Sequence, residues 1–259
     1  MLLTVDIGNT TTAVGVFKKD KLVQNWKIKA DRKRTCDEFK VLLHNLFSLS
    51  KLEEKDVDDG IISSVVPPLT PIFQKVILEI FKIRTLVVGP GLKTGIAILY
   101  DNPQEVGADR IASAVGAREK YGTPCIVLDF GTATTFDAIS SSGDYLGGAI
   151  APGIHISAEA LYLKTAKLPR IELKKVPRAI GKNTIASMHS GLYFGYVGLV
   201  KTIIKEIKLE LGEGVKVVAT GGAASMIFDE IEEIDGYEPH LVLEGLRLIY
   251  EKNRRRRLL

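Results

Sequence analysis

The stretch that decides the fold is Asp129-Phe130-Gly131-Thr132-Ala133-Thr134-Thr135. It follows the apolar run Cys125 to Leu128, which is typical of a buried strand, and it leads into a second apolar segment. The pattern therefore predicts strand, tight turn and strand. The glycine lets backbone N–H groups approach a ligand, because no Cβ is in the way, and the hydroxyls can donate to phosphate oxygens. A carboxylate repels a phosphate, so Asp129 is expected to hold a cation between the two.

The N-terminus repeats this pattern. Asp6-Ile7-Gly8-Asn9-Thr10-Thr11-Thr12 follows the short apolar run Leu2 to Val5, with the same order of carboxylate, apolar residue, glycine and hydroxyls. About half of the chain separates the two aspartates. A single Asp-x-Gly turn after a strand is most simply a hairpin. Two matched copies instead indicate two similar halves that face one another across a cleft.

Composition and charge are those of an ordinary globular chain. Of the 259 residues, 46% are hydrophobic and 25% are charged, and the net charge is only +4. The run Arg254 to Arg257 accounts for that charge and could contact nucleic acid. We interpret it instead as a helix end, where positive charge suits the helix dipole. No nucleic-acid partner is therefore expected.

The expected location is the cytoplasm, without a membrane anchor. Met1 leads directly into a strand, so no secretory leader is expected, and Cys36 and Cys125 form no CxxC pair. The longest uncharged run, from Asn183 to Val200, contains polar residues and three glycines that would be costly in lipid. It is interpreted as a buried helix, placed at a subunit interface.

Helical and strand patterns alternate through the rest of the chain. Three strands at the start, followed by alternating helices and strands, predict a mixed sheet flanked by helices. Apolar spacing and breakers predict helices over residues 37–49, about 69–82, 111–117, 158–163, 184–211 and 240–252.

The segment Gly107-Ala108-Asp109-Arg110 opens the helix expected from Ile111. An acid in the first turn is favoured by the helix dipole, so capping is a structural alternative for Asp109. Capping gives Arg110 no purpose, because a cation is unfavourable at that end. An arginine there is more reasonable if its planar fork meets a carboxylate of a ligand.

Other site signatures are missing from the sequence. The four histidines, His44, His155, His189 and His240, show no metal-ligand spacing, and no GxxxxGK[ST] or GxGxxG motif is present. The late Thr220-Gly221-Gly222 lies between a predicted strand and a helix. Such glycines suit the base and sugar of a nucleotide, although they are also common in packing turns.

Taken together, the two Asp-x-Gly turns and Thr220-Gly221-Gly222 resemble the phosphate-1, phosphate-2 and adenosine elements of the actin–hexokinase–Hsp70 ATPase superfamily. Within it the chain resembles type III pantothenate kinase, most specifically at Gly107-Ala108-Asp109-Arg110. The resemblance implies an α/β fold of two similar ribonuclease H-like, actin-like ATPase domains, with mixed sheets, flanking helices and a cleft. Residues 1–112 would carry the first phosphate loop, and residues 113–259 the second loop and the adenosine motif.

The resemblance also implies an activity, the transfer of the γ-phosphate of ATP to the primary hydroxyl of pantothenate. The product, 4'-phosphopantothenate, is that of the first step of coenzyme A synthesis. Asp109 would be the general base, and Tyr100, Gly107, Ala108 and Arg110 would bind pantothenate. Thr184 would reach the same substrate from the neighbouring subunit of a homodimer.

The same resemblance implies the ligands of ATP and its cations. Asp6 would bind magnesium directly or through water, and Asp129 would bind a monovalent cation, potassium or ammonium. The residues that would bind ATP are Asp6, Ile7, Gly8, Asn9, Thr10, Thr11, Thr12, Ala13, Thr132, Gly221 and Gly222.

Two alternatives belong to other classes. Some relatives of type III pantothenate kinase are transcription-activating accessory factors, so the fold can persist without the activity. Here, however, Asp6, Asp109, Asp129 and Arg110 are all present. A phosphatase or another small-alcohol kinase of the superfamily is the second alternative. A phosphatase would need an acid that positions water near the first phosphate loop, and we identify none in the sequence.

Overall fold

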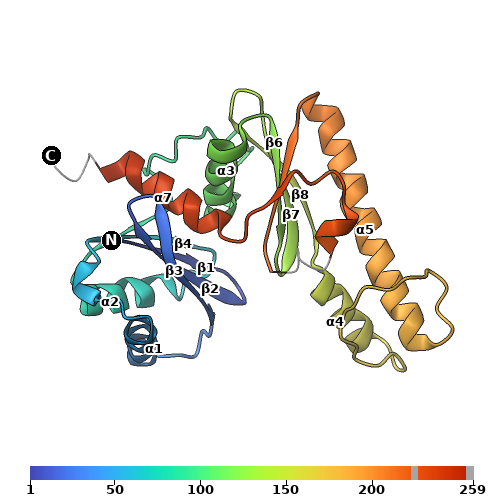
Figure 1. The fold of residues 1–259 in the computed structure, drawn as a ribbon, viewed down its shortest axis with the longest axis horizontal. Helices are drawn as coiled ribbons and strands as arrows, with labels where there is room; N and C mark the ends of the chain where they lie inside the picture. The colour runs from blue at the N-terminus through green and yellow to red at the C-terminus, as the bar shows by residue number, and fades with distance from the viewer. Residues whose placement is uncertain (223–226, 255–259) are drawn as a thin grey trace. The chain divides into compact units, whose positions relative to one another are not determined.

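The structure, a computed structural model, describes residues 1–222 and 227–254 (Figure 1). It divides into two compact units, one made of Met1–Gly116 and the segment from His240, the other of Ala117–Pro239. The boundaries expected from the sequence, 1–112 and 113–259, differ from this division in one main respect. The last helix belongs to the first unit. Beyond Arg254, the arginine run lies outside the described residues.

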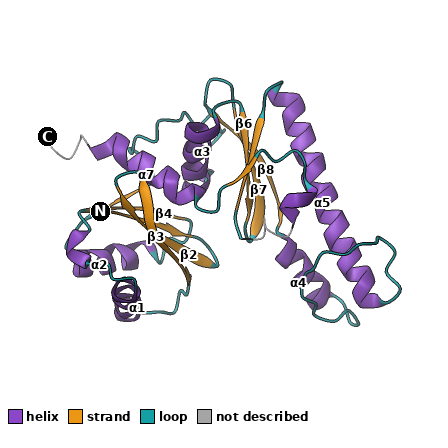
Figure 2. Cartoon of the chain, viewed as in Figure 1, coloured by secondary structure: helices purple, strands orange, loops and turns teal. Residues whose placement is uncertain are grey.

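The first unit is built on a mixed five-stranded sheet (Figure 2). Its strands are β1 (Leu2–Ile7), β2 (Thr11–Lys18), β3 (Lys21–Lys29), β4 (Asp59–Ser64) and β5 (Thr85–Val87). They lie in the order β3-β2-β1-β4-β5. The β1–β2 and β2–β3 pairs are antiparallel, and the β1–β4 and β4–β5 pairs are parallel.

Helices cover both faces of this sheet. On one face, α1 (Cys36–Leu49) and α2 (Thr70–Phe81) pack against each other and bury alternate residues of β1, from Leu3 to Ile7. On the other face, α7 (Leu241–Arg254) contacts β1, β2 and β4 (Figure 1). The apolar residues of α7 are buried there, which is why the helix belongs to the first unit although it ends the chain.

The second unit repeats the arrangement of the first. Its strands are β6 (Cys125–Phe130), β7 (Ala133–Ile139), β8 (Tyr145–Pro152), β9 (Lys216–Thr220) and β10 (Gly236–Tyr237). They lie in the order β10-β9-β6-β7-β8, with β6–β7 and β7–β8 antiparallel and β6–β9 and β9–β10 parallel. The expected duplication is confirmed at the level of strand order and direction. The expected cleft between the halves stays a prediction.

Among the described residues, the second unit contains the helix α4 (Ile154–Lys164) and the long α5 (Thr184–Leu211), which contact each other and β7. Helix α3 (Ala108–Tyr121) begins in the first unit and ends in the second. The 3₁₀ helices in the described part of the chain are η1 (Glu54–Asp56), η2 (Pro103–Glu105) and η3 (Phe228–Glu230). No helix among the described residues has both the length and the hydrophobicity that a membrane crossing requires.

Candidate active site

The first Asp-x-Gly turn joins β1 to β2 at the centre of the first sheet. The Gly8 N–H donates to the Thr11 carbonyl oxygen at 3.0 Å, and the turn exposes Asn9, Thr10 and Thr11. Thr12, in contrast, is fully buried on β2, and its hydroxyl has no hydrogen-bond partner among the described residues. Of the predicted ATP-binding residues here, three therefore offer side chains to solvent. Ile7 and Thr12 bury theirs in the sheet.

Asp6 is held at the end of β1 by the neighbouring parallel strand. Ser63 of β4 lies beside it in the register, and the Ser63 hydroxyl donates to Asp6 Oδ1 at 2.7 Å. Ser63 is fully buried, so this contact fixes the half-buried carboxylate from within the sheet. The sequence alone could not show which of Ser63 and Ser64 faces Asp6, because this depends on the parallel register of β1 and β4.

The segment of Asp109 reaches the same sheet edge as this turn. The Val65 N–H donates to the Ile7 carbonyl oxygen at 3.0 Å, so the chain after β4 lies beside the start of the turn. A Cβ added at Gly107 would lie 3.3 Å from Val65 Cγ1. Through Val65, the start of α3 is therefore close to the first phosphate turn within one unit.

Asp109 itself folds back over Gly107. A Cβ at that position would lie 2.4 Å from Asp109 Oδ1, so the glycine leaves the room that the carboxylate occupies. Burial raises the pKa of Asp109, opposed by the Arg110 backbone N–H, which donates to Oδ1 at 2.8 Å, and by the Arg110 charge. A half-buried carboxylate with a raised pKa is a better proton acceptor than an exposed one.

The loop that carries Tyr100 is tied down by the last helix. Asn253 of α7 is buried, and its amide donates to the Lys93 carbonyl oxygen at 2.8 Å while its Oδ1 accepts from the Lys93 N–H at 3.1 Å. Tyr100 lies half-buried seven residues further along this loop. The sequence contained no signal for Asn253, because its partners are backbone atoms far away in the chain.

The second Asp-x-Gly turn joins β6 to β7 and is one residue shorter than the first. Phe130 pairs with Thr134 here, whereas Ile7 pairs with Thr12 in the first turn. The Gly131 N–H donates to the Ala133 carbonyl oxygen at 3.1 Å, and Thr132 is exposed. Gly153, which precedes α4, packs on this turn and donates to the Thr132 carbonyl oxygen at 3.2 Å. A Cβ at Gly153 would lie 2.4 Å from that oxygen, so only a glycine permits this approach.

Asp129 lies against a second glycine segment. It pairs with Thr220 of β9, and the next residue, Gly221, has a φ of +92°. A Cβ at Gly221 would lie 2.4 Å from Asp129 Oδ1 and 2.6 Å from the Phe130 nitrogen. The structure thus brings Asp129, Thr132, Gly221 and Gly222 to one edge of the second sheet.

Thr184 is the first residue of α5 and is exposed. The preceding Asn183 caps the helix, its side-chain oxygen accepting from the Ala186 N–H at 2.8 Å. This confirms the helix expected over residues 184–211.

A metal site made of protein side chains alone is not present in the described residues, where no group of three or more His, Cys, Asp or Glu side chains could hold an ion. Magnesium typically binds one or two carboxylates together with substrate phosphates and water. Asp6 and Asp129, each next to an exposed turn of N–H and hydroxyl groups, fit that mode.

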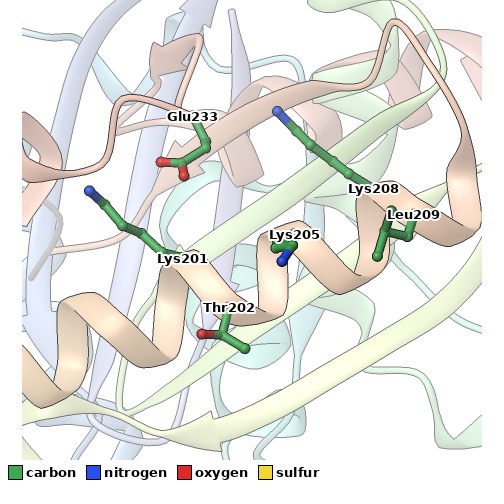
Figure 3. A pocket seen from close by; sticks show the side chains of 6 residues that line it. All are labelled: Lys201, Thr202, Lys205, Lys208, Leu209 and Glu233. Atoms are coloured by element: carbon green, nitrogen blue, oxygen red, sulfur yellow. The ribbon is translucent and has the colours of Figure 1, made fainter.

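A hollow of about 380 Å³ on the second unit is separate from these residues. Figure 3 shows its wall of lysine side chains on α5, with Glu233 opposite. The lining consists of Lys201, Thr202, Lys205, Lys208, Leu209 and Glu233. No predicted site residue lines it, and we assign it no part in the site.

Similar solved structures show the fold of the protein. The inorganic polyphosphate/ATP-glucomannokinase from Arthrobacter sp. strain KM matches with a TM-score of 0.50 at 11% identity, over 97% of this chain and 98% of that one. A protein from Campylobacter jejuni, named for the Baf family of transcriptional activators, matches with a TM-score of 0.61 at 20% identity, over 98% and 99%. At these identities the likeness shows the fold alone, a two-domain actin-like ATPase fold with two mixed five-stranded sheets.

Sequence comparison then gives the family. The model described as type III pantothenate kinase matches residues 2–206. The type III pantothenate kinase of Citrifermentans bemidjiense is 50% identical over 254 residues, which are 98% of this chain and 100% of that protein. The chain belongs to the type III pantothenate kinase family, whose members phosphorylate pantothenate in the first step of coenzyme A biosynthesis.

Proposed function

We propose that this protein phosphorylates pantothenate with magnesium-bound ATP and that Asp109 is the general base. The observation that supports this assignment is the position of Asp109. It is a half-buried carboxylate with a raised pKa, and the contacts of Val65 bring its segment close to the first phosphate turn. In the reaction the hydroxyl oxygen of pantothenate forms a bond to the γ-phosphorus, and the bond to the bridging oxygen of ADP breaks. Asp109 accepts the hydroxyl proton late in this transfer.

Pantothenate carries a carboxylate, which Arg110 would bind. The arginine follows Asp109 directly, so one turn of α3 supplies both the base and the anion-binding fork. Tyr100, on the loop fixed by Asn253, would contact the same substrate. This arrangement orients the hydroxyl by holding the opposite end of the molecule.

The test of the activity is ADP production by the purified protein with magnesium-ATP, with and without pantothenate. We expect turnover only when pantothenate is present. Release of inorganic phosphate without pantothenate would indicate a phosphatase instead. The absence of any turnover by the folded protein would favour a regulatory role.

The cations would divide between the two turns. Asp6, fixed by Ser63, would bind magnesium together with the phosphates, and Asp129 would bind potassium or ammonium. Replacing potassium by sodium should then lower turnover in the natural protein but have little further effect in Asp129→Asn. An equal response to the two salts in both proteins would contradict the role of Asp129.

A homodimer is the proposed assembly. One face of α5 packs in the core through Tyr193, Tyr196 and Val200, whereas Phe194, on another face of the helix, is 41% exposed. A Cβ at Gly191, Gly195 or Gly198 of the same helix would meet nothing within 4 Å among the described residues. A second copy would cover this face, and the exposed Thr184 stands at its end.

Mixed dimers test whether Thr184 serves the partner's site. Asp109→Asn and Thr184→Arg, each inactive alone, would form heterodimers with one intact site if Thr184 acts across the interface. Random mixing should then restore about a quarter of the natural turnover, since half of the dimers carry one site of two. Heterodimer formation would be verified by size and by affinity tag. If turnover is not restored in these heterodimers, Thr184 acts in the site of its own chain.

We also propose a cytoplasmic location. Cys36 and Cys125 are both free, and burial raises the pKa of the Cys125 thiol to about 12, so this thiol is unreactive. Free cysteines are usual in a reducing compartment.

A further inference from the structure

A compact basic turn lies beside the first phosphate turn in the first unit. It follows β3 and contains Arg32, Lys33 and Arg34. The Ala30 N–H donates to the Thr10 carbonyl oxygen at 3.0 Å, which attaches the start of this segment to the phosphate turn. Asp31 then closes it, because its backbone oxygen accepts from the Arg34 N–H at 3.2 Å and its side chain from the Lys33 N–H at 3.0 Å.

Arg32 is the member of this turn that contacts the phosphate loop. Its guanidinium donates to Asn9 Oδ1 at 3.2 Å, and Asn9 is one of the exposed residues between Gly8 and Thr11. A guanidinium has five N–H donors, of which this hydrogen bond uses one. Arg32 is exposed, and within the described part of the chain no ion pair joins it to a carboxylate.

The other two cations of the turn are arranged differently. The Arg34 guanidinium lies 6.0 Å from the centre of the Phe39 ring, on α1, and so packs against the core side of the helix. Lys33 is exposed. Arg32 is therefore the cation that the structure fixes at the phosphate turn.

The phosphate turn has no positive charge of its own to neutralise bound phosphates, and Arg32 would supply one. From Asp6 to Thr12 it contains a carboxylate and no cation. Catalysis of phosphoryl transfer depends mainly on positioning and on neutralising the charge of the phosphates, and arginine is the usual side chain for that purpose. Bound magnesium would supply part of the positive charge, and a guanidinium at Asn9 would supply more.

We infer that Arg32 binds the terminal phosphates of ATP, with Asn9 orienting its guanidinium. This inference rests on the proposed use of ATP at the first turn and adds a residue to it. The ligand is a phosphate chain rather than the carboxylate of pantothenate, which Arg110 at the start of α3 would take.

The test compares Arg32→Gln with Lys33→Gln, which removes the same charge one residue away. Isothermal titration of each full-length protein with magnesium-ATP should give a dissociation constant raised on the order of 10- to 100-fold for Arg32→Gln, as for a lost charge-assisted hydrogen bond. Lys33→Gln should change it by about twofold or less. The affinity for adenosine, which has no phosphate, should be equal in all three proteins.

Equal loss of ATP affinity in the two variants would overturn the inference, because nonspecific charge would then explain it. A parallel loss of adenosine affinity in Arg32→Gln would also overturn it, since that would indicate a distorted turn. Both results can be obtained from a protein that shows no turnover with pantothenate. Failure of the kinase proposal is thereby separated from failure of the Arg32 assignment.

A kinetic experiment adds a second arm. Guanidinium ion at millimolar concentration should restore part of the turnover of Arg32→Ala at subsaturating ATP, whereas urea, which is uncharged and of similar shape, should not. Rescue by both compounds, or by neither, would contradict direct phosphate binding by Arg32.

Discussion

The two halves of the molecule share one sheet topology but surround their aspartates differently. In the first half, the Ser63 hydroxyl donates to Asp6, and Asp109 lies at the same sheet edge. In the second half, glycines lie around the turn, with Gly221 against Asp129 and Gly153 against Thr132. One sheet topology thus surrounds its aspartate with different groups in the two halves. In the first half, charged and hydroxyl side chains lie near the aspartate, and in the second, glycines bring backbone close to backbone.

The largest predicted effect is on the first half. Asp109→Asn should lower turnover by about 10²- to 10⁴-fold, the usual contribution of a general base, while the affinity for ATP is retained. Asp101→Asn, which changes an exposed acid of the preceding segment, is the matched control, and its turnover should be close to that of the natural protein. Steady-state kinetics and ATP titration measure both. Full activity of Asp109→Asn would contradict the assignment of Asp109 as the general base.

The pH dependence of stability and of turnover tests the same assignment of Asp109. Because burial raises the pKa of Asp109, the group binds its proton more tightly in the folded state, so its contribution to stability is lost as pH rises through the folded pKa. Asp109→Asn should therefore be more stable than the natural protein near neutral pH, with the difference shrinking in acid. Turnover of the natural protein should fall in acid as Asp109 becomes protonated. Thermal melts and rate profiles between acid and neutral pH check both trends.

In the second half, the largest expected loss is of stability. Gly221→Ala places a Cβ at a φ of +92°, 2.6 Å from a backbone nitrogen, and should lower the free energy of unfolding by about 2 to 4 kcal/mol. Gly222→Ala is the control, because its Cβ would meet nothing within 4 Å in the described part of the chain. Urea denaturation of the two variants gives the difference. Equal stability would show that the glycine approach to Asp129 is not required.

The sequence was sufficient to predict the repeated strand–turn–strand units, because apolar runs and the Asp-x-Gly motif are local patterns. Three features could not be predicted because they depend on distant parts of the chain. The amphipathic pattern of α7 shows that the helix packs on a sheet, not that the sheet is the first one. The contact of Ser63 with Asp6 depends on the parallel register of β1 and β4. Arg32 lies in a charged run that is most simply a solvated surface.

The smallest predicted effects compare equivalent threonines of the two halves. Thr12 pairs with Ile7 in the first sheet as Thr134 pairs with Phe130 in the second, and both threonines are fully buried. The Thr134 hydroxyl is hydrogen-bonded to the Tyr196 hydroxyl, whereas that of Thr12 has no partner among the described residues. The same substitution should therefore have opposite effects.

Thr12→Val should raise the free energy of unfolding by about 1 kcal/mol, because it removes a buried hydroxyl that forms no hydrogen bond. Thr134→Val should lower it by about 1 kcal/mol, because it takes a partner from the hydroxyl of Tyr196. Urea midpoints of the two variants and of the double variant measure the contrast. An equal loss of stability in the two single variants would mean that the Thr12 hydroxyl has a hydrogen-bond partner in solution. The difference between the halves would then be confined to their turns and would not extend into the strands.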